Sequence, residues 1–402
     1  MIDSIPDLID KTFPIPGRFR GALPSDIAEL SRLLTNKRGD RSLSYLTRPN
    51  FLSAYLHYFL PWNLYRLCLL MPVLNLRLNS GDTITDLGCG PLTFTSALWI
   101  SRPDLRKLPL EFNCVDRSGP ALEAGKKFFK ALAAADNNST CAWKINTIKE
   151  DLDIRQPKAA RKRKQASLVC AVNIFNEIYD SLSHSDTEGL IKMSANAAKL
   201  MHNEAEKDAS ILTVEPGVPQ SGKFISFLRG AFLELGRAPV SPCTHCAACP
   251  FISGYTKIIK GRNWIDTKKR WCHFGFETYD APKKLRDLSK AAKLPKERLV
   301  FSYLLTGAQT KEINAKARQT SISENKKNEN GGARVISDAF LLPENLFGRY
   351  ACSENGLILV TGNRERIEEL NSLSHIPQNR LVEFSANNQY DKKSGALIKG
   401  VK

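Results

Sequence analysis

A strand, a glycine turn and a helix follow one another from residue 83, and this unit limits the possible folds more than any other stretch. The apolar run 83–87 leads into Gly88, Cys89 and Gly90, and a helical pattern follows over about 93–100. Further apolar strands are expected at residues 110–115, 142–145, 167–172, 211–215 and 299–305, and helical patterns follow those at 110–115, 167–172 and 211–215. This alternation predicts an α/β domain built on a parallel sheet with helices on both faces.

The residues at the strand ends predict a nucleoside site. Gly88 and Gly90 lack β-carbons, so a ligand can approach the backbone at the carboxyl edge of the sheet. Asp116 closes the second strand, 26 residues after Gly90, and is suited to accept hydrogen bonds from ribose hydroxyls. The first turn holds no G-x-G-x-x-G, which disfavours a dinucleotide. A tight turn without any ligand is the alternative interpretation.

The order Asp-x-Gly-x-Gly at residues 86–90 resembles motif I of class I S-adenosylmethionine (SAM) methyltransferases, and the resemblance covers roughly residues 80–305. It implies a Rossmann-like domain that binds SAM, with the glycines at the methionine, Asp86 at the ammonium group, Asp116 at the ribose and Asp151 at the adenine. Asn173 falls where a substrate amine would be held, although Asn-Ile-Phe-Asn-Glu replaces the Asn/Asp-Pro-Pro-aromatic sequence of base-amino methyltransferases. No catalytic residue can be named. The implied cofactor contacts are Asp86, Gly88, Gly90, Asp116, Asp151 and Asn173.

Four of the ten cysteines lie close together, as Cys243-x2-Cys246-x2-Cys249 with Cys272 after 22 intervening residues. Three closely spaced thiolates and a distant fourth favour a [4Fe–4S] cluster held by all four. A structural zinc site is the alternative, but zinc normally takes two separated Cys-x2-Cys pairs. Radical SAM chemistry would need a three-cysteine cluster with one open iron, which Cys272 disfavours. Unrelated buried cysteines are a weaker interpretation because the segment is polar.

The chain is strongly basic, with 58 Lys and Arg against 41 Asp and Glu, a net charge of +17 and a pI near 9.4. Such a charge indicates a polyanionic partner such as nucleic acid. Six basic residues lie in each of the runs 155–164 and 257–270, and the second run is interleaved with Tyr255, Trp264 and Trp271, which favours RNA. Solvated loops are the alternative for any single run. The predicted RNA contacts are Arg161, Lys162, Arg163, Lys164, Lys257, Lys260, Arg262, Lys268, Lys269 and Arg270.

The hydrophobic content of 42% is enough for a sizeable core. The apolar and charge patterns along the chain predict several segments. The N-terminus carries early acids and no apolar signal region, and the apolar run 59–76 is interrupted by Pro61, Arg66 and Pro72. We therefore expect no membrane span and a cytoplasmic location, or the mitochondrial matrix in a eukaryote. The expected segments are a helical cap (1–78), a methyltransferase-like domain (79–310) with a cysteine insertion (240–280), a flexible linker (311–333), a β appendage (334–390) and a basic tail (391–402).

Four further stretches occur in one order: VEPGVP at 214–219, Cys243 to Pro250, WCHF at 271–274, and YAC at 350–352. Together they resemble the ribosomal small-subunit assembly methyltransferase-like family, which includes mitochondrial methyltransferase-like protein seventeen. The resemblance implies a SAM-methyltransferase fold with an iron–sulfur cluster, acting on the small ribosomal subunit and its rRNA in assembly or translation. A non-catalytic RNA-binding assembly factor with the same fold is the alternative. The cluster would then hold the basic segment 257–270 in place for RNA.

Overall fold

The chain forms two compact units in a computed structural model, and each unit is described by itself. Unit 1 comprises residues 1–186, 203–210 and 276–299, and unit 2 comprises residues 187–202, 211–275 and 300–402. The boundaries of the expected segments remain a prediction. The structure describes residues 1–35, 45–74, 76–136, 141–152, 154, 163–179, 182, 186–252, 271–308, 332–371, 373–383, 389–391 and 394–401.

The larger sheet has the strand order β3-β2-β1-β4-β5-β8-β6, with β7 paired to β8. Strand β1 runs parallel to β2 and β4, and β2 runs parallel to β3. The predicted α/β fold is confirmed, but β8 is antiparallel to both β5 and β6, so the sheet is mixed. The strands are β1 (Thr83–Leu87), β2 (Glu111–Asp116), β3 (Lys144–Lys149), β4 (Ala166–Val172), β5 (Ala205–Pro216), β6 (Arg237–Ser241), β7 (Phe274–Glu277) and β8 (Arg298–Ala308).

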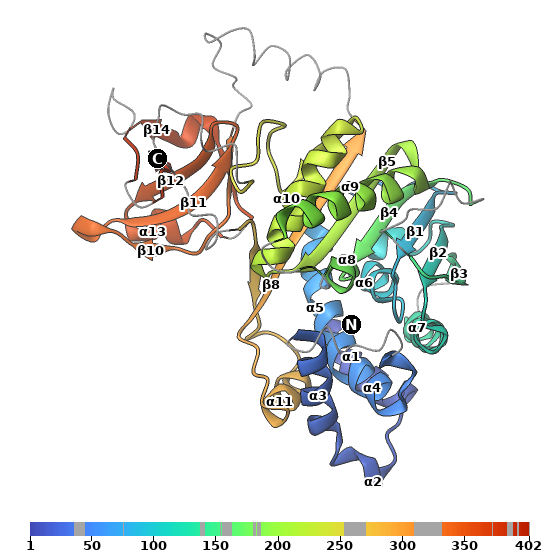
Figure 1. Cartoon of the computed structure of the whole chain (residues 1–402). Helices are drawn as coiled ribbons and strands as arrows, with labels where there is room; N and C mark the ends of the chain where they lie inside the picture. The colour runs from blue at the N-terminus through green and yellow to red at the C-terminus, as the bar shows by residue number, and fades with distance from the viewer. Residues whose placement is uncertain are drawn as a thin grey trace. The chain divides into compact units, whose positions relative to one another are not determined.

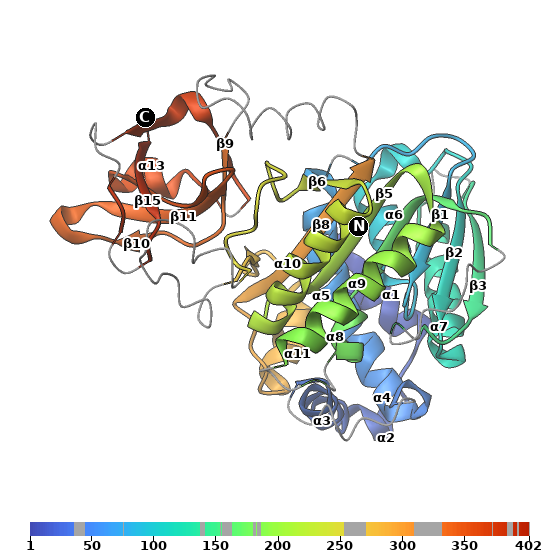
Figure 2. The same cartoon turned by 45° about the horizontal axis from the view of Figure 1, so that its top comes forward.

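Helices α6 (Thr93–Ser101) and α7 (Gly119–Ala134) follow β1 and β2 and lie beside them in Figures 1 and 2. The Ser118 side chain caps α7 by accepting a hydrogen bond from the Ala121 N–H (3.3 Å). An aromatic cluster joins these helices to β2, because the Trp143 ring lies 4.9 Å from that of Trp99 and 4.7 Å from that of Phe112. Every residue of β1 is buried, which fixes the glycine turn that follows it in a rigid setting.

The N-terminal helices of unit 1 share one core with a helix from much later in the chain. Phe51, Tyr58 and Trp62 pack with Leu285, and the Trp62 indole N–H donates to Ser289 Oγ (3.1 Å). Figure 1 shows α3 and α11 side by side. The elements of this helical cap are η1 (Ile2–Ser4), α1 (Ile5–Thr12), α2 (Gly17–Arg20), α3 (Leu23–Thr35), η3 (Tyr45–Thr47), α4 (Pro49–Ala54), the π-helical turn η4 (Tyr55–Phe59), α5 (Leu60–Leu70), η5 (Met71–Val73) and α11 (Lys283–Ala291).

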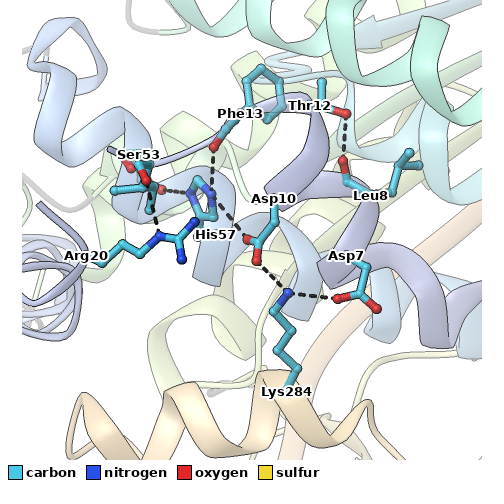
Figure 3. A network of polar contacts seen from close by, with 10 residues as sticks. Asp7, Leu8, Asp10, Thr12, Phe13, Arg20, Ser53, His57 and Lys284 are labelled. Carbon is cyan, nitrogen blue, oxygen red and sulfur yellow. Dashed lines mark hydrogen bonds and ion pairs between the residues drawn. The ribbon is translucent and has the colours of Figure 1, made fainter. Parts of the chain in front are cut away.

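A polar network ties α1, η4 and α11 together (Figure 3). Lys284 Nζ lies 2.8 Å from Asp7 Oδ1 and 2.5 Å from Asp10 Oδ2. His57 is buried, with Nδ1 2.8 Å from the Ser53 carbonyl and Nε2 3.1 Å from the Phe13 carbonyl. These contacts hold α11 against the N-terminal helix although the two are distant in sequence.

Unit 2 contains a second sheet with the order β13-β9-β11-β12-β15-β14, and β10 pairs with β11. Strand β11 pairs antiparallel with β12, and Gly356 takes a positive φ of 93° in the turn between them. Ile358, Val360 and Ile367 lie in the core of this sheet. Its elements are β9 (Gly332–Val335), β10 (Phe340–Leu341), η9 (Pro343–Asn345), β11 (Phe347–Ser353), β12 (Gly356–Gly362), α13 (Arg364–Glu368), β13 (His375–Pro377), η10 (Gln378–Arg380), β14 (Leu381–Glu383) and β15 (Leu397–Val401).

Contacts within unit 2 join this second sheet to the loop that follows β6. Arg334 Nε donates to the Pro242 carbonyl (3.0 Å), and Thr244 Oγ1 donates to the Gly332 carbonyl (3.3 Å). The cysteine loop is thereby fixed to strand β9. The remaining helical elements of the chain are η6 (Pro103–Leu105), α8 (Phe175–Tyr179), α9 (Thr187–Glu204) and α10 (Pro219–Glu234).

Candidate functional site

The glycine turn after β1 is held against the two neighbouring strands. The N–H groups of Gly88 and Cys89 both donate to the Val115 carbonyl, at 2.8 and 3.0 Å. Gly88 has a φ of +69°, and a β-carbon there would lie 2.2 Å from Ile174 Cδ1. Only glycine fits this position, because any side chain would displace the residues that follow β4.

Asp116 is fixed by the same turn. Its Oδ2 accepts a hydrogen bond from the Gly90 N–H and its Oδ1 accepts one from the Ser118 N–H, both at 2.8 Å. Burial raises the pKa of Asp116, and the two backbone hydrogen bonds partly offset this rise. The carboxylate therefore has one orientation, with lone pairs left for hydroxyl groups of a ligand.

Asp86 is a buried carboxylate with one oxygen lacking a partner. Its Oδ1 lies 3.4 Å from the Cys170 sulfur, which donates to it, whereas its Oδ2 has no hydrogen-bond partner among the described residues. Burial raises the pKa of Asp86 to about 7. An unpaired buried carboxylate oxygen is costly, so this atom marks a place for a hydrogen-bond donor or a cation.

A cavity of about 100 Å³ lies over the carboxyl ends of β1, β2 and β4, all within unit 1. The six residues predicted to contact the cofactor all line it. Asn173 does so with a left-handed backbone (φ 56°), a strained conformation that is often found at functional sites. The cavity thus combines a buried carboxylate, an oriented carboxylate and glycine backbone, which suits a nucleoside joined to a cationic group.

Sequence reasoning missed the wall of this cavity that the helical cap supplies. Leu46, Tyr55 and Asn63 line it from η3, η4 and α5. Burial, and then the charge of Glu177, raise the pKa of Tyr55 far above its ordinary value. The π-helical form of η4 marks this segment in three dimensions, but the sequence itself shows only an aromatic stripe. Glu177, at the start of α8, also lines the cavity and forms an ion pair with Arg117 (3.1 Å).

A second cavity, of about 30 Å³, lies within unit 2 and brings four cysteines together. Cys243, Cys249 and Cys272, three of the four predicted metal ligands, line it. Cys246 is not among its lining residues, and Cys352 of β11 takes that place. The only sequence signal for Cys352 was the YAC stretch, because 80 residues separate it from Cys272.

Positive charge and buried peptide groups surround these thiols. Arg229 Nη2 of α10 donates to the carbonyls of His245 and Ala247, both at 2.8 Å. Burial raises the pKa of the Cys243, Cys272 and Cys352 thiols, while the Arg229 guanidinium opposes that rise. The unmetallated thiols are therefore neutral at pH 7, and a bound metal would take them as thiolates.

Two neighbours position the cysteines further. His245 Nε2 lies 3.3 Å from Cys352 Sγ, and burial lowers the pKa of His245 to about 4, so the ring is neutral at pH 7. Ser302 Oγ donates to the Cys272 carbonyl (2.7 Å). The donor set of four thiols with a guanidinium beside them suits a metal–thiolate centre. No group of three His, Cys, Asp or Glu in the described ranges is already arranged to hold a single metal ion.

The predicted RNA contacts are mostly outside the described residues: Arg161, Lys162 and the whole run 257–270. Lys164 is exposed. Arg163 instead forms ion pairs with Glu150 and Glu204, both at 3.1 Å, and its side chain is only 14% exposed. The structure therefore gives Arg163 an internal role, and it is not free for a phosphate.

The fold is SAM-methyltransferase-like. Its sheet has this strand order with one reversed strand, β8, and an acid and a glycine turn lie at the carboxyl edge of the sheet. Residues 84–338 match the family model described as "Mitochondrial small ribosomal subunit Rsm22". That match covers more than half of the chain, so the chain belongs to the Rsm22 family. None of the curated proteins compared with it matches.

Several solved structures are similar to the chain at low identity. A complex between the Haloferax volcanii Trm112 methyltransferase activator and the putative methyltransferase is 12% identical, covering 62% of this chain and 89% of that chain (TM-score 0.29). Geranyl diphosphate methyltransferase in complex with GPP and sinefungin is 12% identical, covering 72% and 100% (TM-score 0.32). TrmN from Thermus thermophilus is 14% identical, covering 44% and 42% (TM-score 0.24). Within the described residues, no helix is long and apolar enough to cross a membrane.

The packing of Gly88 generates a stability prediction. We expect Gly88→Ala to lower the free energy of unfolding by about 1–3 kcal/mol, because the β-carbon clashes with Ile174 and the positive φ is strained. Gly81→Ala is the matched control, since Gly81 also has a positive φ (86°) but a β-carbon there would meet nothing within 4 Å. Urea unfolding measures both variants, and equal losses would contradict the proposed contact with Ile174.

Proposed function

We propose that this chain binds SAM in the unit 1 cavity, carries a [4Fe–4S] cluster in the unit 2 cavity, and acts on the small ribosomal subunit and its rRNA during assembly or translation. The single observation that best supports the cofactor is the buried, unpaired Oδ2 of Asp86 in a cavity that all six predicted contact residues line. Membership of the Rsm22 family supports the ribosomal partner.

The residues of the cavity fit the parts of SAM. Asp86 would pair with the ammonium group, and Asp116 would accept hydrogen bonds from the ribose hydroxyls. Asp151, which lines the same cavity, would face the adenine. When bound, SAM supplies a methyl group already activated on a sulfonium, so the protein needs to orient an acceptor and exclude water rather than provide a strong base.

The cysteine cavity has the donor set of an iron–sulfur cluster. Its four sulfurs line one space, and a four-iron core binds each sulfur at a different iron. Arg229 would offset part of the negative charge of four thiolates. We therefore propose Cys243, Cys249, Cys272 and Cys352 as ligands, with Cys352 in place of the predicted Cys246. Zinc is the alternative.

RNA binding is proposed from charge and family. The net charge of +17 favours a partner or a solvent shell rich in anions. The basic run 257–270 lies between Cys249 and Cys272 in the sequence. A cluster that holds both cysteines would restrict the ends of this run. A non-catalytic assembly factor that keeps the cofactor cavity is the second candidate, because the stretch from Asn173 to Glu177 departs from the Asn/Asp-Pro-Pro-aromatic sequence of base-amino methyltransferases.

The raised pKa of Asp86 generates a pH prediction. The carboxylate must be ionised to pair with the SAM ammonium group, so SAM affinity should rise by about tenfold from pH 5.5 to pH 7.0 as Asp86 loses its proton. Asp86→Asn should bind SAM weakly and with little dependence on pH over this range. Isothermal titration calorimetry measures both. Equal pH dependence in the two proteins would show that Asp86 does not carry it.

The cysteine assignment is tested by a matched pair of substitutions. We expect Cys352→Ser to lose most of the bound iron and sulfide, because one of the four thiolates is removed, whereas Cys246→Ser should keep them. Iron and sulfide per chain, with visible absorbance, are measured on protein purified without oxygen. Loss of iron in Cys246→Ser alone would restore the assignment made from spacing, and stoichiometric zinc without iron would exclude the cluster.

One substitution separates the enzyme from the assembly factor. We expect Asp116→Ala to abolish the incorporation of labelled methyl groups into small-subunit rRNA, because the ribose contact is lost. Glu111→Ala is the control, since Glu111 lies at the opposite end of the same strand. If neither wild type nor Asp116→Ala incorporates methyl groups, and both restore small-subunit assembly in cells, the non-catalytic candidate is favoured.

A further inference from the structure

The second sheet of unit 2 closes into a small barrel. Strand β9 pairs antiparallel with β11, and β11 pairs antiparallel with β12. Strand β12 then pairs parallel with β15, and β15 pairs antiparallel with β14. Strand β13, which precedes β14 in the chain, pairs antiparallel with β9. The path of paired strands therefore returns to the strand on which it began.

This connectivity is that of the oligonucleotide/oligosaccharide-binding (OB) fold. If β13 and β14 are counted as one strand interrupted by η10, the barrel has the order 1-2-3-5-4-1 with strands 3 and 5 parallel. The helix α13 comes between strands 3 and 4, and Figures 1 and 2 show it beside β11. OB folds bind their ligands on the outer face of strands 2 and 3. Because one fold can serve many functions, the side chains of that face must identify the ligand.

Two aromatic rings stand together on the outer face of strand 2, which is β11. Ala351 belongs to the barrel core, so the adjacent Tyr350 points to the outer face. Phe340 of β10 pairs with Gly348, two residues before Tyr350, and therefore stands on the same face as Tyr350. The ring centroids of Phe340 and Tyr350 lie 5.1 Å apart, and both residues are partly exposed. We name these two residues the aromatic pair.

The same face of β11 also carries one of the clustered cysteines. Cys352 lies two residues after Tyr350 and lines the cysteine cavity. Its cross-strand partner is Arg334, which donates to the Pro242 carbonyl of the cysteine loop. The outer face thus has two parts, one at the cysteine loop and one at the aromatic pair. Both parts lie within unit 2.

On the basis of the RNA partner proposed above, we propose that the aromatic pair is a stacking platform through which the barrel binds single-stranded RNA. Aromatic side chains on OB folds bind successive unpaired bases by stacking. The net charge of +17 attracts a polyanion to the chain. A neutral oligosaccharide would gain nothing from this charge, so the nucleic acid is the better match among the ligands of the fold.

The charge of the barrel itself indicates which part of the RNA it contacts. Residues 332–402 contain nine Lys and Arg against eight Asp and Glu, so the barrel adds little attraction for phosphate groups. Its contribution to binding is therefore stacking on bases, while basic residues elsewhere in the chain neutralise phosphates. In a duplex the bases already stack on one another, so the aromatic pair selects single strands.

Fluorescence anisotropy with the full-length protein and a labelled single-stranded RNA of about 12 nucleotides tests this proposal. We expect Tyr350→Ala and Phe340→Ala each to weaken binding by about tenfold, because a stacked base is lost. Tyr350→Phe keeps the ring and should bind as the wild type does. The slope of log affinity against log salt should not change, since no phosphate contact is removed. Tyr279→Ala is the matched control, because Tyr279 is a 68% exposed aromatic residue of unit 1.

Urea unfolding checks that each variant is folded, and Phe340→Ala decides if Tyr350→Ala does not fold. Wild-type affinity in the alanine variants, or a changed salt slope, overturns the stacking platform while the proposed RNA partner stands. Equal weakening with a duplex of the same sequence also overturns it, because a platform for unpaired bases leaves duplex binding unchanged. A wild-type protein that binds neither RNA overturns the proposed RNA partner as well.

Discussion

The cofactor site of unit 1 depends on the close contact between the Gly88 turn and the residues that follow β4. This contact brings the carboxyl ends of β1, β2 and β4 together, and hydrogen bonds from the turn to the Val115 carbonyl and to Asp116 hold it in place. The same closeness removes Asp86 from water and raises its pKa to about 7. The fold thus keeps a buried carboxylate, and a cationic ligand can offset the free-energy cost of removing its charge from water.

Unit 2 depends on a different balance of charge and burial. Arg229 is itself buried, and it is stabilised by two carbonyl oxygens of the cysteine loop. The thiols around it come from that loop, from Cys272 just before β7, and from β11 of the second sheet. A metal centre there would join three parts of unit 2, which also contact one another through polar bonds such as that from Arg334 to the loop. Such a centre would have a structural role.

The helical cap is part of the cofactor site as well as a cover for the sheet. Its α5 supplies Asn63 and also Arg66, which donates to the Asn63 and Asn173 side chains, and η4 supplies Tyr55. The cap is in turn held by α11 through the Lys284 network (Figure 3). One wall of the cavity therefore depends on helices that carry no recognised motif.

The sequence by itself determined the alternation of strands and helices, the glycine turn, the acid at the end of the second strand and three of the four clustered cysteines. These features are local: hydrophobic periodicity, absent side chains and short spacings are properties of neighbouring residues. The tertiary structure alone decided that β8 is reversed, that Cys352 joins the cysteines, that Arg163 pairs internally, and that Arg66 donates to the side chain of Asn173. Each of these depends on groups that are far apart in the sequence and meet only in the folded chain. Arg66 and Asn173, for example, are 107 residues apart.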